Sequence, residues 1–209
     1  HNDMSEIRIF SLEDFQISDI ETIIDQSNSL ELSKDAEDAI IKCWQYLSSK
    51  LESGDHAFYG INTGFGSLCN VIINHGQIGD LQRNLVRSHA CGTGDVVPKE
   101  IIKIILLLKI KSLSYGYSGI SLEVVKRLLL FFNHNILPVL YQQGSLGASG
   151  DLAPLAHLSL PLIGEGEVWF NAVRRSGQDI LKEFDLKPIE LGAKEGLALL
   201  NGTQFSTGY

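Results

Sequence analysis

The stretch GSLGASGDLAPLAHLSL, residues 144–160, decides the fold more than any other part of the sequence. Its first half has glycine at positions 144, 147 and 150, which frees the backbone to adopt conformations that other residues avoid. Its second half is apolar and carries Pro154 where the first turn of a helix tolerates a proline. The stretch therefore predicts a tight glycine-rich loop that enters an apolar helix.

Helical signals dominate the sequence around this stretch. From Ser33 to Gly54 a capping serine, early acidic residues and late lysines predict a helix that ends at a glycine. Residues 167–176, EVWFNAVRRS, place β-formers around an Asn-Ala turn and predict a small hairpin. Further helices are expected over residues 77–90, from Pro98 to about Tyr115, over residues 121–135, and again near Ser176 and near Lys194. The predicted fold class is mainly α, with a small β excursion.

Three glycine-rich loops separate these helices: residues 59–67 (YGINTGFGS), 91–95 (CGTGD) and 144–150 (GSLGASG). A mainly helical protein rarely needs so much backbone freedom without a functional reason, so we interpret them as active-site loops. They lack the GxGxxG and GxxxxGK[ST] spacings of phosphate-binding loops, and neither Ser149 nor Ser118 has the GxSxG context of a hydrolase. The histidines show no HExxH or similar paired spacing, so we expect no metal.

The composition is that of a folded chain, with 209 residues of which 44% are hydrophobic and 20% charged. A net charge of −8 excludes a nucleic-acid binder driven by phosphate neutralisation, because that binding needs a cationic surface. No linker, repeat or low-complexity segment divides the sequence. We therefore expect residues 1–209 to form a single domain.

The cysteines and the most apolar segment predict a cytoplasmic protein. Cysteines at 43, 69 and 91 form no CxxC pair and no disulfide framework, which fits a reducing compartment. The apolar run 101–110 is interrupted by Lys103 and Lys109 and is too short to span a bilayer, so we predict a buried core helix and no membrane partner. We also expect residues 1–3, ahead of Met4, to be a vector-derived remnant, and the natural chain to continue beyond residue 209.

Four segments together resemble one protein family. Residues 144–160 are closely similar to the prosthetic-group segment of the aromatic amino acid ammonia-lyases. Three more segments match that family in chain order: YGINTGFGSL (59–68), LQRNLVRSHACGTG (81–94) and KEGLALLNGTQ (194–204). The resemblance covers most of residues 59–209 and implies the N-terminal part of an ammonia-lyase-like fold.

The resemblance implies a prosthetic group made from the chain itself. In that family an Ala-Ser-Gly triplet, here Ala148, Ser149 and Gly150, cyclises to 4-methylidene-imidazol-5-one (MIO) with no external cofactor. The bare Gly150 lets its amide nitrogen approach the Ala148 carbonyl carbon, and loss of the Ser149 hydroxyl as water creates the methylidene. The substrate amine would add to this electrophile. At a helix N-terminus, backbone amides would favour the negative charge that develops on the ring.

The same resemblance assigns roles to five further residues. Tyr59 would remove the β-proton of the substrate, which requires surroundings that lower the pKa of its phenol. Ser88 and His89 stand at the position that reads the substrate side chain, and this pair resembles the histidine-specific branch. Asn201 would bind near the ring and the substrate carboxylate. Asp151 is a weaker candidate, because capping of the following helix explains it about equally well.

The implied activity is a carbon–nitrogen lyase reaction on a small amino acid, with conversion of L-histidine to trans-urocanate and ammonia in a cytoplasmic homotetramer. Two residues depart from the family pattern: Arg87 stands where an apolar residue is expected, and Tyr117 where histidine is more usual. Family members are much longer, so we expect this chain alone to be inactive. The alternatives are an ammonia-lyase or aminomutase for tyrosine or phenylalanine, and a non-catalytic helical domain that never forms the ring.

Overall fold

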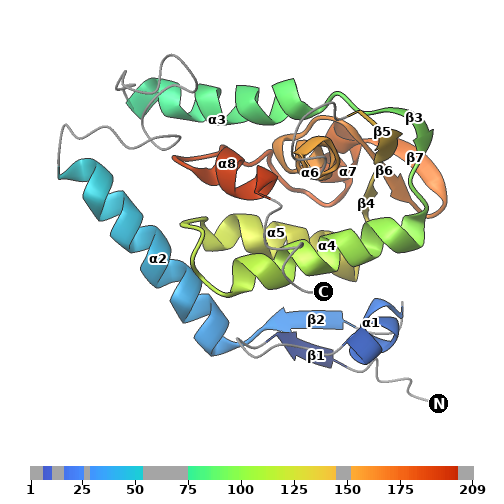
Figure 1. Cartoon of the computed structure of the whole chain (residues 1–209), viewed down its shortest axis with the longest axis horizontal. Coiled ribbons are helices and arrows are strands. Elements are labelled where there is room, and N and C mark those ends of the chain that lie inside the picture. The colour runs from blue at the N-terminus through green and yellow to red at the C-terminus, as the bar shows by residue number, and fades with distance from the viewer. Residues whose placement is uncertain (1–6, 11–16, 26–28, 54–74, 145–151, 202–209) are drawn as a thin grey trace.

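The computed structural model describes residues 7–10, 17–25, 29–53, 75–144 and 152–201 (Figure 1). Helices make up most of this part of the chain, which confirms the mainly α class. In chain order the elements are β1 Ile7–Phe10, α1 Ile17–Ile24, β2 Ser29–Leu32, α2 Lys34–Glu52, α3 His75–His89, β3 Thr93–Val96, α4 Lys99–Ser114, α5 Leu122–Asn133, β4 Leu137–Pro138, β5 Tyr141–Gln143, α6 Leu152–Ser159, the 3-10 helix η2 Leu160–Ile163, β6 Glu167–Phe170, β7 Val173–Ser176, α7 Gly177–Glu183 and α8 Glu195–Leu200.

The predicted helix starts are confirmed where a side chain caps them. The Ser33 hydroxyl accepts a hydrogen bond from the Ala36 amide at 3.1 Å, and α2 begins at the next residue. The Ser176 hydroxyl accepts one from the Asp179 amide at 3.1 Å and starts α7 in the same way. Each bond satisfies one of the amides that the first turn of a helix leaves without a partner.

The core lies between α4 and α5, which form a helical hairpin through the middle of the molecule (Figure 1). Apolar residues at helical spacing on both helices are fully buried. They include Leu106, Leu107, Ile110, Val124, Leu128, Phe131 and Phe132. The prediction of a buried core helix over residues 101–110 is thus confirmed for most of its length, although Ile101 itself is 47% exposed.

The hairpin predicted over residues 167–176 is present as β6 and β7. Asn171 and Ala172 both have positive φ, at 50° and 61°, as the two-residue turns that match strand twist require. The short strand β4 extends this hairpin to a three-stranded sheet of order β4-β6-β7.

Other strands were missed by the sequence prediction. Strand β1 pairs with β2 in parallel, and β3 pairs with β5. The loop predicted at residues 91–95 is therefore wrong for residues 93–95, which belong to β3. Thr93 pairs with Gln143, fifty residues later in the chain, and such non-local pairing leaves no local signal in a sequence.

Helix α8 packs closely on α3 because it carries a glycine at the contact. A Cβ atom at Gly196 would lie only 2.6 Å from the carbonyl oxygen of Gln82. The Gln82 side chain is fully buried, and its Oε1 atom accepts a hydrogen bond from the Leu197 amide at 3.2 Å. Gln82 therefore satisfies an amide in the first turn of α8 and holds the two helices together.

Replacement of Gly196 by alanine should destabilise the protein by about 1–3 kcal/mol, because the new methyl group must push α8 away from the Gln82 carbonyl. The higher helix propensity of alanine, about 1 kcal/mol, acts in the opposite direction. Urea unfolding measures the free energy of unfolding of the variant relative to that of the wild type, which is the net of these two effects. Gly79→Ala is the matched control on α3, since its Cβ atom would lie 3.3 Å from its nearest neighbour, the Leu191 carbonyl oxygen. Equal stability of the two variants would contradict the close α3–α8 contact.

Candidate active site

Three of the site residues predicted from the sequence lie within the described part of the structure. Ser88 and His89 form the last turn of α3, and Asn201 follows the last residue of α8. The ring-forming triplet Ala148, Ser149 and Gly150 lies outside the described residues, as do Tyr59 and Asp151. Gly144 and Leu152, which flank the triplet and Asp151 in the sequence, are described.

The ends of α3 and α8 that carry these residues lie at the same end of the helix pair. Gly79 lies near Leu191, and further along both segments Gln82 lies against Gly196. Contacts that advance together along both segments mean that α3 and α8 run in the same direction (Figure 1). From the Gln82 contact, His89 lies roughly 10 Å and Asn201 roughly 7 Å further along. The fold thus brings together two segments that are more than one hundred residues apart in the sequence.

The His89 ring is oriented by its own helix. Its Nδ1 atom lies 2.8 Å from the Leu85 carbonyl oxygen and 3.2 Å from the Ser88 hydroxyl. A carbonyl oxygen can only accept, so the neutral ring carries its proton on Nδ1 and keeps a lone pair on Nε2. Within the described residues, no group forms a hydrogen bond with Nε2. His89 therefore presents a half-buried acceptor at the end of α3.

Two of the predicted glycine loops meet directly beyond this end of α3. Gly144, the first residue of the loop 144–150, has φ +146°, and a Cβ atom there would lie 2.5 Å from the Cα atom of Gly92. The Cys91 thiol also donates a hydrogen bond to the Gly144 carbonyl at 3.1 Å. Glycine at both positions permits this close approach of two backbones. The start of the segment that leads to the Ala-Ser-Gly triplet is thereby held against the residues that follow Ser88 and His89.

Helix α6, which begins two residues after the triplet, is also bound to the residues that follow α3. Its His157 accepts a hydrogen bond at Nε2 from the Gly92 amide at 2.9 Å, and its ring packs edge-on against Tyr141 of β5. Burial lowers the pKa of His157 below its usual 6.5, which favours the neutral ring that this bond requires. The predicted helix after the glycine loop is confirmed, with Pro154 in its first turn.

A buried lysine reaches the end of α8 from the core helix α4. Lys109 is 1% exposed, and its ammonium donates hydrogen bonds to the carbonyl oxygens of Ala198 at 2.7 Å and Asn201 at 2.9 Å. Burial lowers the pKa of Lys109 to about 7. The sequence identified this lysine as an interruption of an apolar run, which is the signal of a buried cation, but it did not reveal the partner.

Glu195 fastens the start of α8 in the same way. Its carboxylate accepts hydrogen bonds from the Gly192 amide at 3.1 Å and from the Ser121 hydroxyl at 3.2 Å, which ties α8 to the start of α5. Burial raises the pKa of Glu195, and the two hydrogen bonds act in the opposite direction. Sequence reasoning missed Gln82 and His157 as contributors to this site, because their partners are backbone atoms far away in the chain. It also missed Glu195, whose partner at Ser121 lies 74 residues away.

The two departures from the family pattern lie on the surface. Arg87 forms an ion pair with Glu165, in which its Nε atom lies 2.8 and 2.9 Å from the two carboxylate oxygens, and this pairing raises the pKa of the guanidinium. Arg87 thus links the end of α3 to the turn before β6. Tyr117 is 80% exposed in the connection between α4 and α5. Both residues are surface-exposed rather than part of the core.

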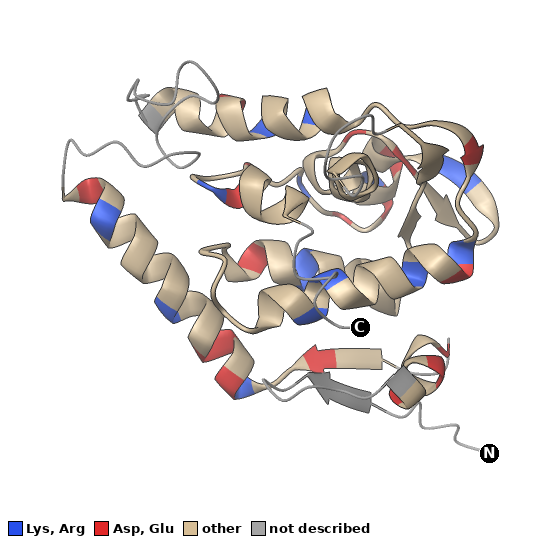
Figure 2. Ribbon diagram, in the orientation of Figure 1, with Lys and Arg blue, Asp and Glu red and all other residues tan. Residues whose placement is uncertain are grey.

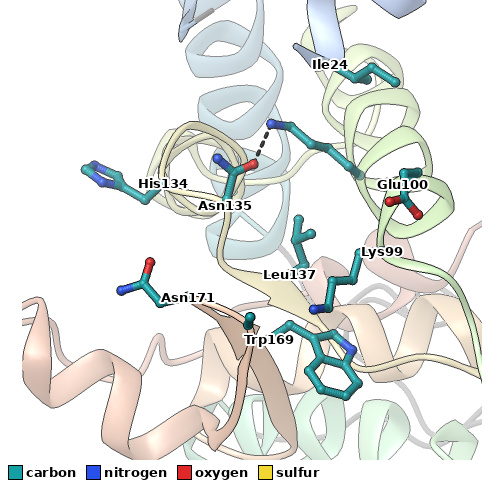
Figure 3. A pocket seen from close by; sticks show the side chains of 10 residues that line it. Ile24, Lys99, Glu100, His134, Asn135, Leu137, Trp169 and Asn171 are labelled. Atoms are coloured by element: carbon teal, nitrogen blue, oxygen red, sulfur yellow. Dashed lines mark hydrogen bonds between the residues drawn. The ribbon is translucent and has the colours of Figure 1, made fainter. Parts of the chain in front are cut away.

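A pocket of about 410 Å³ lies away from these residues, between α4, the end of α5 and the β6–β7 turn (Figure 3). Two contacts join residues that line it: the Lys103 ammonium donates to the Asn135 side chain at 2.5 Å, and the Lys99 ammonium lies 4.8 Å from the Trp169 ring centroid. Neither Ser88, His89 nor Asn201 lines it. The candidate site is therefore the end of α3 and α8, not this pocket.

The described residues show mixed charges on α2 and no cluster of metal-binding side chains. Acidic and basic side chains are interspersed along α2 rather than segregated on it (Figure 2). In the same residues, no three side chains of His, Cys, Asp or Glu come together as a metal site would require. Among the described helices, none combines the length and the apolar content that a membrane span needs.

The sequence was compared with known protein families. A family model described as aromatic amino acid lyase matches residues 15–209. The chain belongs to the aromatic amino acid lyase family.

Two similar curated proteins within the family are named histidine ammonia-lyase. A histidine ammonia-lyase of Legionella pneumophila (strain Lens) is 48% identical over 204 residues, and one of Staphylococcus aureus (strain JH9) is 44% identical over 195 residues. These matches cover 98% and 93% of this chain. The chain spans 40% and 38% of the length of these relatives, so it corresponds to part of such a protein.

Solved structures of the family share the fold described above. The histidine ammonia-lyase of Trypanosoma cruzi aligns with a TM-score of 0.85 at 35% identity over 95% of this chain and 38% of its own. A tyrosine aminomutase aligns with a TM-score of 0.85 at 28% identity, over 94% of this chain and 37% of its own. The predicted N-terminal part of an ammonia-lyase-like fold is confirmed.

The Gly92–His157 hydrogen bond should make the stability of the protein sensitive to acid. The unfolded chain takes up the histidine proton near pH 6.5, whereas burial lowers the pKa in the folded state. The free energy of unfolding should therefore fall as the pH drops below about 6.5 and level off below the folded pKa. His157→Gln, which keeps an acceptor, should remove this slope, and His157→Leu should cost about 1–3 kcal/mol at neutral pH.

Chemical unfolding between pH 5 and pH 8 checks this expectation. His134→Gln is the control, because His134 is exposed at the end of α5 and should leave the slope in place. A slope that survives in His157→Gln would show that other groups cause it.

Proposed function

We propose that this chain is the N-terminal part of a histidine ammonia-lyase, which releases ammonia from L-histidine and forms trans-urocanate. The observation that carries the proposal is the His89 ring, whose Nε2 lone pair is free among the described residues. The N–H group of an imidazole substrate and the phenol O–H of tyrosine can both donate to this acceptor, whereas the phenyl ring of phenylalanine offers nothing to it. Between histidine and tyrosine, the 44–48% identity with proteins named histidine ammonia-lyase supports histidine.

The prosthetic group would come from Ala148, Ser149 and Gly150 of this chain. Two observations fit this assignment: the segment before the triplet is held at Gly144 by the close approach to Gly92, and α6 begins at Leu152, two residues after the triplet. The ring, when formed, supplies an electrophile that makes the substrate amine a better leaving group. The start of α6 directs backbone amides toward this region, which would favour negative charge there.

The remaining site residues act on the substrate itself. Tyr59 removes the β-proton, which requires a depressed phenol pKa in the complete site. Asn201, at the end of α8, hydrogen-bonds the carboxylate end of the amino acid while His89 holds the imidazole. Asp151 is a weaker candidate for the site, because capping of the following helix would explain it about equally well. Ser88 supports His89, since its hydroxyl lies 3.2 Å from Nδ1.

The assembly and location belong to the same proposal. We place residues 1–209 in a single domain of a cytoplasmic homotetramer in which active sites are shared between subunits. An amino acid is the proposed partner, with no nucleic acid, membrane, metal or external cofactor.

A second candidate is an aminomutase or an ammonia-lyase for tyrosine or phenylalanine. The structural similarity to a tyrosine aminomutase at 28% identity and to the phenylalanine aminomutase of Pantoea agglomerans at 30% supports it. A non-catalytic domain is the third reading, and it differs from the others because it would never form the ring.

The first test supplies L-histidine, L-tyrosine and L-phenylalanine in parallel to the longest native form of the protein and follows near-ultraviolet absorbance. We expect urocanate from histidine alone. Product from tyrosine or phenylalanine would show that the proposed substrate is wrong and that the proposed lyase chemistry is right. His89→Phe should lower kcat/KM for histidine by about 10-fold to 1,000-fold, because the imidazole then loses its acceptor. Lys50→Phe, on the exposed end of α2, is the control for a new aromatic side chain.

Intact mass tests the ring directly. Formation of the ring removes two water molecules, so the wild-type mass should fall by that amount and the Ser149→Ala mass should not. Ser149→Ala should also abolish product formation. A wild-type protein with its full calculated mass and no product would favour the non-catalytic reading.

A further inference from the structure

We infer that Lys109 is a positioning residue that holds the backbone of Asn201 so that its side chain meets the substrate. The inference rests on the proposed function, because it assigns a task to Asn201. Its structural part stands on the geometry of Lys109 alone. A lysine of the central core helix is thereby linked to the end of a short helix that carries a site residue.

The hydrogen bonds of Lys109 go to the very end of α8. Its Nζ atom donates to the carbonyl oxygen of Ala198 at 2.7 Å and to that of Asn201 at 2.9 Å. The last carbonyls of a helix have no partner within the helix and need one from elsewhere. Lys109 provides that partner for two of them at once. One of the two belongs to Asn201, so the lysine fixes the backbone from which the proposed substrate contact extends.

The conformation of Asn201 makes this external contact necessary. Asn201 has φ −72° and ψ 108°, an extended conformation, so α8 ends before it and its carbonyl oxygen has left the helical path. Helix α8 has only six residues, too few for stable helix formation without tertiary contacts. Gln82 and Glu195 hold its start, and Lys109 holds its end.

The cost of burying Lys109 argues for a specific task. The side chain is 1% exposed, and an ammonium in such a place is unfavourable unless its donors are satisfied. Both of its described hydrogen-bond partners are backbone carbonyls, which carry no full charge. A neutral amine still has two N–H donors for these two acceptors, so the contact persists in either protonation state. Hydrophobic packing alone would be met by methionine, which has a similar volume.

Lys103 offers a matched comparison on the same helix. It is 6% exposed and lies beside Phe132, with the ring centroid 4.7 Å from Nζ. Its ammonium donates to the Asn135 side chain, in the pocket of Figure 3 and not at α8. Lys103→Met therefore removes a buried ammonium from α4 without releasing Asn201.

The test compares Lys109→Met, Lys109→Arg and Lys103→Met in the longest native form of the protein. Lys109→Met should lower kcat/KM for L-histidine by about 10-fold to 100-fold, the usual effect of removing a residue that orients a ligand-contacting group. It should also raise the dissociation constant for trans-urocanate, measured by calorimetry. Lys103→Met should change neither, and Lys109→Arg, which keeps N–H donors, should recover part of the loss.

A double-mutant cycle with Asn201→Ala shows whether Lys109 acts through Asn201. If it does, Lys109→Met costs nothing further once the Asn201 side chain is gone. Losses that multiply would overturn the inference, and so would Lys109→Met kinetics equal to those of Lys103→Met. Intact mass confirms that each variant forms the ring to the wild-type extent.

Amide hydrogen exchange separates this inference from the proposed function. Exchange in a peptide that covers α8 and Asn201 should be faster in Lys109→Met than in the wild type and unchanged in Lys103→Met. A wild-type protein that acts on none of the three amino acids would end the proposed function. Even then, unchanged exchange in Lys109→Met would overturn the positioning role. Faster exchange would still support the structural claim that Lys109 holds the end of α8.

Discussion

The candidate site depends on the contact between α3 and α8 at Gln82. The fully buried Gln82 side chain satisfies the Leu197 amide, and Gly196 allows the two backbones to approach. Because the two helices run in the same direction, this contact places Ser88, His89 and Asn201 at one end of the pair. A displaced α8 would separate the residues proposed to read the two ends of the substrate. The contact is polar, so the geometry is defined more narrowly than apolar packing alone would define it.

Buried polar side chains that bind backbone atoms hold the rest of the site. His157 accepts from the distant Gly92 amide, Lys109 donates to the end of α8, and Glu195 accepts from the nearby Gly192 amide. Each of them satisfies a backbone group at a loop or helix end that would otherwise be buried without a partner. The site is therefore assembled from short elements whose ends are fixed from outside.

Local features of the fold could be predicted from the sequence, and non-local ones could not. Ser33 and Ser176 marked helix starts, and the Asn-Ala pair marked the hairpin turn, because each acts on residues within a few positions. The pairing of β3 with β5 was missed because its partners lie almost fifty residues apart. At the site, Ser88, His89 and Asn201 followed from a family resemblance. Gln82 and His157 did not stand out, since nothing near them in the sequence reveals a backbone partner.

By itself the sequence determined the mainly helical class, the family, and the Ala-Ser-Gly triplet with the chemistry that it implies. These follow from local propensity and from motifs that are contiguous along the chain. Only the tertiary structure decided that α3 and α8 run side by side in the same direction and that Gly92 contacts Gly144. It also decided that the Lys109 ammonium donates a hydrogen bond to the Asn201 carbonyl oxygen. The physical reason is that a buried polar group can be satisfied by any backbone atom that folding brings within about 3 Å, and sequence separation does not constrain that choice.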